Sequence, residues 1–224
     1  MFSLSRGERL FLTLLLLYSL VPVLGGLLRL ADLTFGMPAL PPNGRAVASP
    51  TPIVLHILGS VVFCVIGALQ FLPGIRRANI NLHRRLGRVV ALAGLLSAMT
   101  GLWMTLVFEF PVGLQGDLLY WVRIGVSLAM AGFIVWAIIS VRGGALADHR
   151  AHMIRAYAIA QGASTQAVLG IGWMLLFGTE LSGPLRDVVM VSAWGINLLA
   201  AELLIIPTQK PSAPNARVLK MEDR

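Results

Sequence analysis

The chain has 224 residues, of which 57% are hydrophobic and 12% charged, and its formal net charge is +8. Soluble globular domains carry about 25% charged residues, so this composition excludes a disordered chain, a collagen-like repeat and a soluble nucleic-acid-binding protein. Long uncharged runs instead indicate an all-α, multi-pass membrane protein built as one helical bundle.

Six runs in the sequence are long enough to cross about 30 Å of hydrocarbon as helices. They cover 10–28, 53–75, 89–108, 124–141, 156–179 and 188–206, and only the last contains a formal charge, at Glu202. Backbone in hydrocarbon must satisfy its own hydrogen bonds, so we expect helices rather than open strands. The sequence therefore predicts six transmembrane helices in a single domain over 1–207. We expect the polar tail over 208–224 to be disordered and cytoplasmic.

The first run needs a separate decision, because Arg6 and Arg9 precede it as in a cleavable signal peptide. The run is long for a signal peptide, and it ends at Arg29 without an Ala-x-Ala cleavage site. We therefore favour an uncleaved span, followed by a loop rich in Pro and Gly over 36–52.

The positions of the basic residues predict the orientation in the membrane. Fourteen of them fall in the amino-terminal segment, the loops after the second and fourth runs, and the tail: Arg6, Arg9, Arg76, Arg77, Arg84, Arg85, Arg88, Arg142, Arg150, Arg155, Lys210, Arg217, Lys220 and Arg224. The other side has four: Arg29, Arg45, Arg123 and Arg186. Because cytoplasmic loops collect Lys and Arg, we expect both termini in the cytoplasm and the protein in a bacterial inner membrane.

Ionisable and polar side chains near the bilayer are the candidate functional residues. His56 falls near the outer end of the second run, His83 just before the third, and His149 and His152 before the fifth. The alternative is that they are interfacial histidines bonded to loops. Three further polar residues fall inside the runs: Gln70, Gln166 and Glu202. Each could instead hold helices together, the glutamines by hydrogen bonds and Glu202 by pairing with Arg88 or Arg155.

Two strings of residues carry a more specific signal. They read His56-x-x-Gly59, Gly67-x-x-Gln70-Phe71, Arg76, His83-Arg84-x-x-Gly87-Arg88, and then His149-Arg150-x-x-Met153-Ile154-Arg155-x-Tyr157. The pattern resembles a family of bacterial predicted membrane proteins, the domain of unknown function 2306, with a family-like core over 53–179. The chain departs from it at His152, where the family is expected to have an aromatic residue, usually Trp. The resemblance implies a membrane-embedded core and brings no established activity.

The sequence is more loosely similar to the b-type cytochromes of membranes, which hold each haem between histidines of different helices. His83 and His149 fall on the same predicted side, so they could hold one haem b at the cytoplasmic face. Five arginines would then meet the propionates: Arg76, Arg84, Arg88, Arg150 and Arg155. His56 has no partner histidine in the fourth run, so we expect no second haem. A quinone at the cytoplasmic face is the variant of this hypothesis.

Two other classes of function stay open from the sequence. His83, His149 and His152, with Asp148 or Glu202, could form the site of a membrane zinc-dependent hydrolase, although the His-Glu-x-x-His signature is absent. The third class is a non-catalytic carrier, or an accessory or assembly subunit of a membrane complex. The single cysteine, Cys64, excludes an intrachain disulfide.

Overall fold

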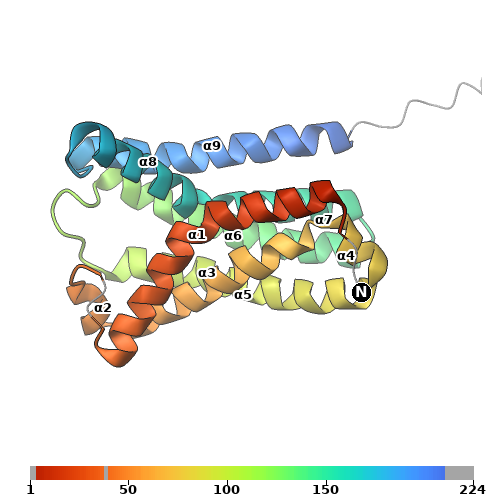
Figure 1. Cartoon of the computed structure of the whole chain (residues 1–224), viewed down its shortest axis with the longest axis horizontal. Helices are drawn as coiled ribbons and strands as arrows, with labels where there is room; N and C mark the ends of the chain where they lie inside the picture. Colours follow the sequence, from red (N-terminus) through yellow and green to blue (C-terminus); the bar gives the residue numbers. More distant parts are fainter. Residues whose placement is uncertain (1–3, 38–39, 210–224) are drawn as a thin grey trace, which may run out of the picture.

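The computed structural model describes residues 4–37 and 40–209, which form nine helices and no strand (Figure 1). The helices are α1 (Arg6–Phe35), α2 (Gly44–Ala48), α3 (Pro50–Gln70), α4 (Pro73–Ala78), α5 (Ile80–Val107), α6 (Asp117–Arg142), α7 (Leu146–Ala160), α8 (Gly162–Phe177) and α9 (Gly183–Gln209). Five of these, α1, α3, α5, α6 and α9, are long and apolar enough to cross a membrane. The prediction of an all-helical protein with several apolar helices is confirmed, and the tail over 210–224 lies outside the described residues.

Several helix boundaries differ from the predicted runs because local capping residues decide them. α5 begins at Ile80, and the Asn79 side chain caps it by accepting a hydrogen bond from the amide of Leu82 at 2.9 Å. His83 therefore lies inside the first turn of a helix and not ahead of it. The second run is divided at Phe71 and Leu72, because Pro73 starts the separate helix α4. The loop predicted over 36–52 contains the short helix α2.

The predicted continuous span over 156–179 is also divided. α7 ends at Ala160, α8 begins at Gly162, and Gln161 stands between them. Its side chain accepts a hydrogen bond from Ser164 Oγ at 2.7 Å and donates one to Ser19 Oγ on α1 at 2.8 Å. The residue between α7 and α8, Gln161, is therefore hydrogen-bonded to another helix of the bundle. Six crossings remain a prediction, with α7 and α8 as the two halves of the fifth.

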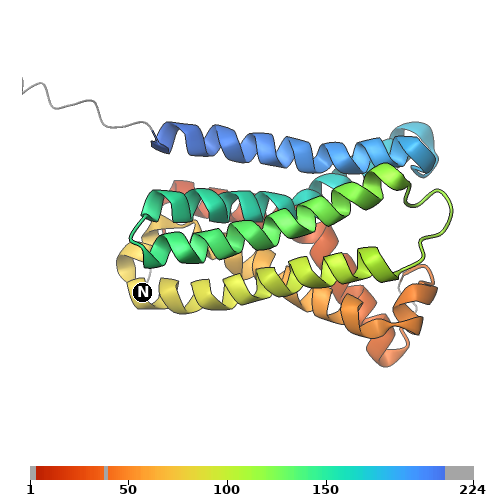
Figure 2. The same ribbon diagram turned by 180° about the vertical axis from the view of Figure 1, so that it is seen from behind.

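The helices run roughly along one axis, so their ends meet at two ends of the bundle (Figures 1 and 2). The starts of α1, α5 and α7, together with α4 and the ends of α6 and α9, meet at one end, which we call the basic end (right in Figure 1). α2, the ends of α1 and α8, and the start of α9 meet at the opposite end.

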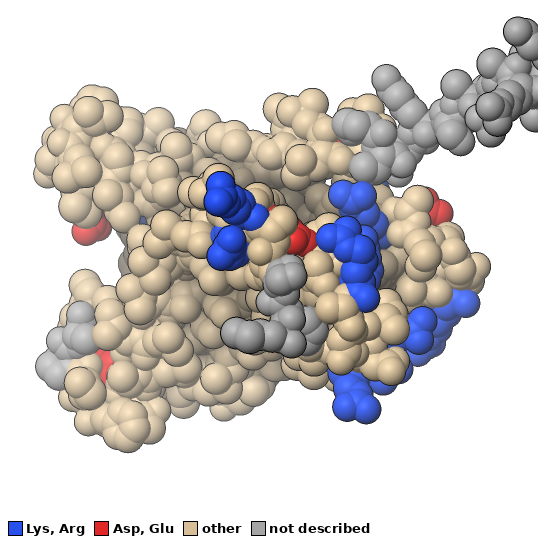
Figure 3. All heavy atoms as spheres, turned by 45° about the vertical axis from the view of Figure 1, so that its right-hand side comes forward, with Lys and Arg blue, Asp and Glu red and all other residues tan. Residues whose placement is uncertain are grey.

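The basic end carries a cluster of Lys and Arg side chains, which the space-filling view shows in blue (Figure 3). The described members of the predicted cytoplasmic set belong to the elements that meet there: Arg6, Arg9, Arg76, Arg77, Arg84, Arg85, Arg88, Arg142, Arg150 and Arg155. The rest of that set lies outside the described residues: Lys210, Arg217, Lys220 and Arg224. The arrangement is the one that the predicted orientation requires, and the side of the membrane remains a prediction.

The centre of the bundle is formed by α3, α5, α6 and α7. Phe63, Val90, Ile134 and Tyr157 are buried together there. α3 and α5 approach closely at Gly59, where a side-chain Cβ would lie 2.8 Å from the carbonyl oxygen of Ala93. Small residues at a helix crossing let two backbones pack without a clash, as is common between membrane helices.

α1 covers the side of this core and contacts α3 and α8. It contains Pro22 in its interior, and it changes direction sharply midway along its length (Figure 1). Proline removes one helical hydrogen bond and its ring clashes with the preceding turn, which is the usual cause of such a bend. Leu14, Leu17 and Leu24 on α1 are exposed, as a face in contact with lipid requires.

Candidate functional site

The basic end holds three of the four histidines, and they come from two helices. His83 lies at the start of α5, and His149 and His152 lie one turn apart on α7. All three lie at the end of the bundle where α5 and α7 both begin. α6 packs against both α5 and α7. The structure thus places at one end of the bundle the histidines that the two cofactor hypotheses use.

His149 is held in one orientation by the backbone of α6. Its Nδ1 lies 2.9 Å from the carbonyl oxygen of Ala137. A carbonyl oxygen only accepts hydrogen bonds, so Nδ1 carries the hydrogen and the lone pair of neutral His149 is on Nε2. Histidines that bind metal in proteins usually donate their second nitrogen to a carbonyl or carboxylate in this way. His149 is therefore prepared to act as an Nε2 ligand.

Three other polar nitrogen atoms at this end are buried without a hydrogen-bond partner among residues 4–37 and 40–209. They are Nδ1 of His83, Nδ1 of His152 and Nε2 of Gln70. The side chain of Gln70 lies against α5 at Gly87, which is one turn after His83 on that helix. A Cβ at Gly87 would be 3.4 Å from Gln70 Oε1. Buried polar atoms almost always have partners, so each exception in a native structure calls for an explanation. A bound ligand would supply one.

The ring of His152 stacks on Phe133 of α6, with 5.9 Å between the ring centroids. Burial lowers the pKa of His152, and the positive charge of Arg155 lowers it further. His152 is therefore mainly neutral at pH 7. His152 therefore packs against an aromatic ring, and no carboxylate in the described part of the chain forms an ion pair with it.

The five arginines predicted to meet haem propionates divide into two groups. Arg155 donates to Glu202 on α9 through Nε and Nη2, at 2.6 and 2.8 Å, and so is already engaged. The other four are exposed and form no ion pair with a described residue: Arg76, Arg84, Arg88 and Arg150. These four are free to bind an anionic group.

The structure gives no support to the zinc hypothesis. Within residues 4–37 and 40–209, no three His, Cys, Asp or Glu side chains are arranged to hold a metal ion. His83, His149 and His152 lie at one end of the bundle without converging in that way. Glu202, one of the two carboxylates considered for this site, is bound to Arg155.

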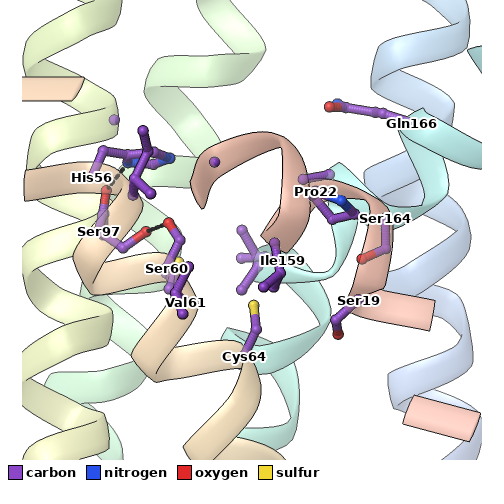
Figure 4. Close-up of a pocket in the computed structure, with 18 of the residues that line it drawn as sticks. Ser19, Pro22, His56, Ser60, Val61, Cys64, Ser97, Ile159, Ser164 and Gln166 are labelled. Atoms are coloured by element: carbon purple, nitrogen blue, oxygen red, sulfur yellow. Dashed lines mark hydrogen bonds between the residues drawn. The ribbon is translucent and has the colours of Figure 1, made fainter. Parts of the chain in front are cut away.

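A cavity of about 290 Å³ forms a second candidate site, away from the three histidines (Figure 4). It lies between the bend of α1 at Pro22 and the break between α7 and α8, where Ala160 and Ala163 line it. Most of the residues that line it are apolar, and none of them is Asp, Glu, Lys or Arg. A mainly apolar cavity with a few polar groups is the usual form of a small-molecule site.

His56, Ser60 and Ser97 form the polar wall of this cavity (Figure 4). His56 Nδ1 donates to the backbone carbonyl of Ser97 at 2.9 Å, and Ser60 Oγ lies 2.7 Å from Ser97 Oγ. The Oγ1 of Thr100 is 3.3 Å from the same His56 nitrogen. As for His149, this arrangement leaves a lone pair on Nε2 of neutral His56.

A network of buried polar side chains adjoins the cavity at the α7–α8 break. Ser19 and Gln161 exchange hydrogen bonds, and Ser164 joins them. Tyr18 on α1 bonds to Thr165 on α8 and to Asn197 on α9, and Thr165 donates to Asn197 at 2.9 Å. The remaining predicted residue of this region, Gln166, lines the cavity and donates to the carbonyl of Met190 on α9 at 3.0 Å. These bonds connect α1, α8 and α9 around the break.

The sequence reasoning selected His56 but not the serines around it or Gln161. Single serines are common in membrane helices, so Ser60, Ser97 and Ser127 gave no separate signal. Ser60 follows His56 by four residues and therefore shares its face, and that spacing could have indicated the wall.

A family model described as predicted membrane protein, DUF2306, matches residues 53–205 of the chain. The match runs from α3 into α9, beyond the core predicted over 53–179. No curated protein and no solved structure shows significant similarity to the chain. The similarity to b-type cytochromes thus rests on the histidine pattern alone.

Proposed function

The chain belongs to the DUF2306 family of predicted membrane proteins, and we propose that it has a redox role, with one haem b held by His83 and His149 at the basic end. In this proposal the basic end faces the cytoplasm of a bacterial cell and the bundle crosses the inner membrane six times. α7 and α8 together make the fifth crossing. The distribution of Arg and Lys supports the orientation.

The observation that carries the proposal is the geometry of His149. Its Nδ1 is bonded to the Ala137 carbonyl at 2.9 Å, so its Nε2 lone pair is free for a ligand. His83 comes from a different helix at the same end of the bundle, and its own Nδ1 is buried without a partner among the described residues. Two imidazoles from different helices are the ligand set of b-type haem in membranes.

The arginines of this end support the same ligand. A haem b bound there would supply reversible one-electron transfer. Four arginines have no ion-pair partner in the described part of the chain: Arg76, Arg84, Arg88 and Arg150. Their guanidinium groups can therefore bind the haem propionates or remain in the water at the cytoplasmic face. Arg155 does not take this role, because it is bound to Glu202.

The other functions considered for the sequence have less support. No arrangement of three metal-binding side chains occurs in residues 4–37 and 40–209, so zinc hydrolysis is not our proposal. A quinone at the basic end would use the same unpartnered nitrogen atoms of His83 and Gln70. A carrier or accessory subunit would contain neither cofactor.

An absorption spectrum tests the proposal directly. The full chain, produced with haem available and purified in detergent, should show Soret and α-band changes on reduction. His83→Ala and His149→Ala should abolish both bands. His152→Ala, one turn from His149 on the same helix, should keep them and serves as the matched control. A wild-type protein without these bands, or folded His83→Ala and His149→Ala proteins that retain them, would refute the haem proposal.

A further inference from the structure

The cavity beside His56 has no part in the proposed haem site, and its chemistry is distinct. We infer that it binds a neutral, lipophilic ligand with a ring-sized head that carries hydroxyl or carbonyl oxygens, the class to which quinols and quinones belong. The head would lie against His56, Ser60 and Ser97, and the apolar tail would extend into the bilayer.

The position of the cavity is the first reason. It lies where one helix bends, α1 at Pro22, and where the α7–α8 pair is interrupted at Gln161. Interrupted helices inside a membrane expose backbone groups that need partners, and they are tolerated where the backbone lines a cavity or is buried in protein. Binding sites of membrane transporters are commonly built from such helices. A helix break and a proline bend beside the same cavity therefore point to a ligand site.

The charge of the lining indicates that the ligand is neutral. Among the residues that the structure describes, no Asp, Glu, Lys or Arg lines the cavity. An ionised ligand would lose its hydration there without gaining a counter-charge, which is costly in an apolar environment. A neutral head with polar oxygens meets no such penalty.

The hydrogen-bonding groups of the wall indicate which oxygens the ligand carries. His56 presents the Nε2 lone pair, because Nδ1 is bonded to the Ser97 carbonyl. Ser60 and Ser97 share one hydrogen bond at 2.7 Å, so one of the two hydroxyl hydrogens is left for another acceptor. The Ser127 hydroxyl also lines the cavity. The wall thus offers an acceptor and hydroxyl donors, which complement a quinol hydroxyl and a quinone carbonyl.

The size of the cavity limits the head to about one substituted ring. An engineered protein cavity of roughly 150 Å³ holds benzene, and the volume here is about 290 Å³. A hydrocarbon chain alone would fit this space but would leave the polar wall unused. The polar wall is therefore the feature that selects a ring with oxygens over a lipid tail.

Trp194 lines the cavity and provides an optical signal. The full chain, purified in detergent with or without haem, would be titrated with decylubiquinone while tryptophan fluorescence is recorded. We expect saturable quenching, with the dissociation constant raised about tenfold in His56→Ala. Ser127→Phe, which fills the cavity, should abolish saturation. Ser192→Ala is the control variant, because Ser192 bonds to the Val189 carbonyl on an exposed surface of α9.

A matched ligand separates the head from the tail. n-Decylbenzene has a ring and the same alkyl chain but no oxygen, so restoring the fluorescence quenched by decylubiquinone should need at least about tenfold more of it than a competitor that binds as tightly as decylubiquinone. Displacement by decylbenzene with equal strength would show a lipid-tail site and overturn the inference. Unchanged quinone binding in both His56→Ala and Ser127→Phe, or none in the wild type, would overturn it as well. Since the titration needs no haem, it can fail or succeed independently of the spectrum.

Discussion

Arg155 on α7 donates two parallel hydrogen bonds to Glu202 on α9, from Nε to Oε1 at 2.6 Å and from Nη2 to Oε2 at 2.8 Å. The pair joins the broken helix to the last helix, close to the basic end. Glu202 is the single formal charge inside the six predicted runs. Its geometry matches a structural clamp, in which a bidentate guanidinium neutralises a carboxylate that would otherwise be costly near the membrane.

Glu202→Gln is expected to destabilise the protein by about 1 kcal/mol, since the pair is only partly exposed and a glutamine amide has one acceptor oxygen. One of the two hydrogen bonds is then lost, and the other no longer joins two charged groups. For a chain of this size the melting temperature should fall by about 2–4 °C, as measured by thermal unfolding in detergent. Arg77→Gln is the control, because Arg77 is 73% exposed and its nitrogen lies 3.9 Å from Glu8. Equal melting temperatures for Glu202→Gln and the wild type would show that the clamp does not stabilise the fold.

Gly59→Ala should be strongly destabilising, by about 1–3 kcal/mol, because the added Cβ would lie 2.8 Å from the Ala93 carbonyl oxygen on α5. Gly125→Ala on α6 is the matched control, since no described atom beyond the neighbouring backbone of α6 lies within 4 Å of the position its Cβ would take. That change should be neutral or slightly stabilising, because alanine favours a helix over glycine. Comparison of the two melting temperatures checks the α3–α5 contact. If both variants melted alike, the close approach of these helices would be wrong.

The pKa of His152 predicts a dependence of stability on pH. Burial and Arg155 lower this pKa in the folded protein, so below the ordinary value of about 6.5 the unfolded chain binds a proton that the folded protein resists. Stability should therefore fall as the pH drops from 7 towards 5, and His152→Gln should make that fall smaller. Melting temperatures of both proteins across this range provide the measurement. A His152→Gln protein with the same pH profile as the wild type would contradict the assignment.

The apolar runs could be predicted from the sequence because length and hydropathy alone set the minimum for a crossing helix. The break at Gln161 could not, because no charge interrupts 156–179 and the run reads as one helix. What holds the break is tertiary: Ser19 from α1 exchanges hydrogen bonds with Gln161 over 142 residues of sequence. Contacts between residues so far apart in the sequence leave no mark on the local pattern of apolar and polar residues.

The candidate sites show the same division. His83 and His149 were selected because ionisable groups near a membrane are costly and hence informative. The Nδ1 bond of His149 to Ala137, which determines its free nitrogen, appears only once α6 and α7 are folded against each other. The cavity wall depends likewise on α3 and α5 meeting at Ser60 and Ser97.

The membrane orientation can be tested by cysteine labelling in intact cells. The native Cys64 is buried in α3, so it can be retained as an unreactive background. Ala78→Cys and Ala145→Cys place thiols at the basic end, and Val112→Cys and Thr179→Cys place them at the opposite end, all at exposed positions. A membrane-impermeant maleimide should label the second pair in intact spheroplasts and the first pair only after permeabilisation, because basic segments are retained in the cytoplasm.

The same four variants test whether α7 and α8 cross the membrane together. α8 has 16 residues, which is shorter than the roughly 20 that a separate crossing needs, so the crossing requires residues of α7 as well. Ala145→Cys and Thr179→Cys, which flank the pair, should then label from opposite sides. Labelling of both from one side would mean that α7 and α8 form a re-entrant element, and the protein would have five crossings with its ends on different sides. Reversed labelling of all four positions would instead place the basic end outside.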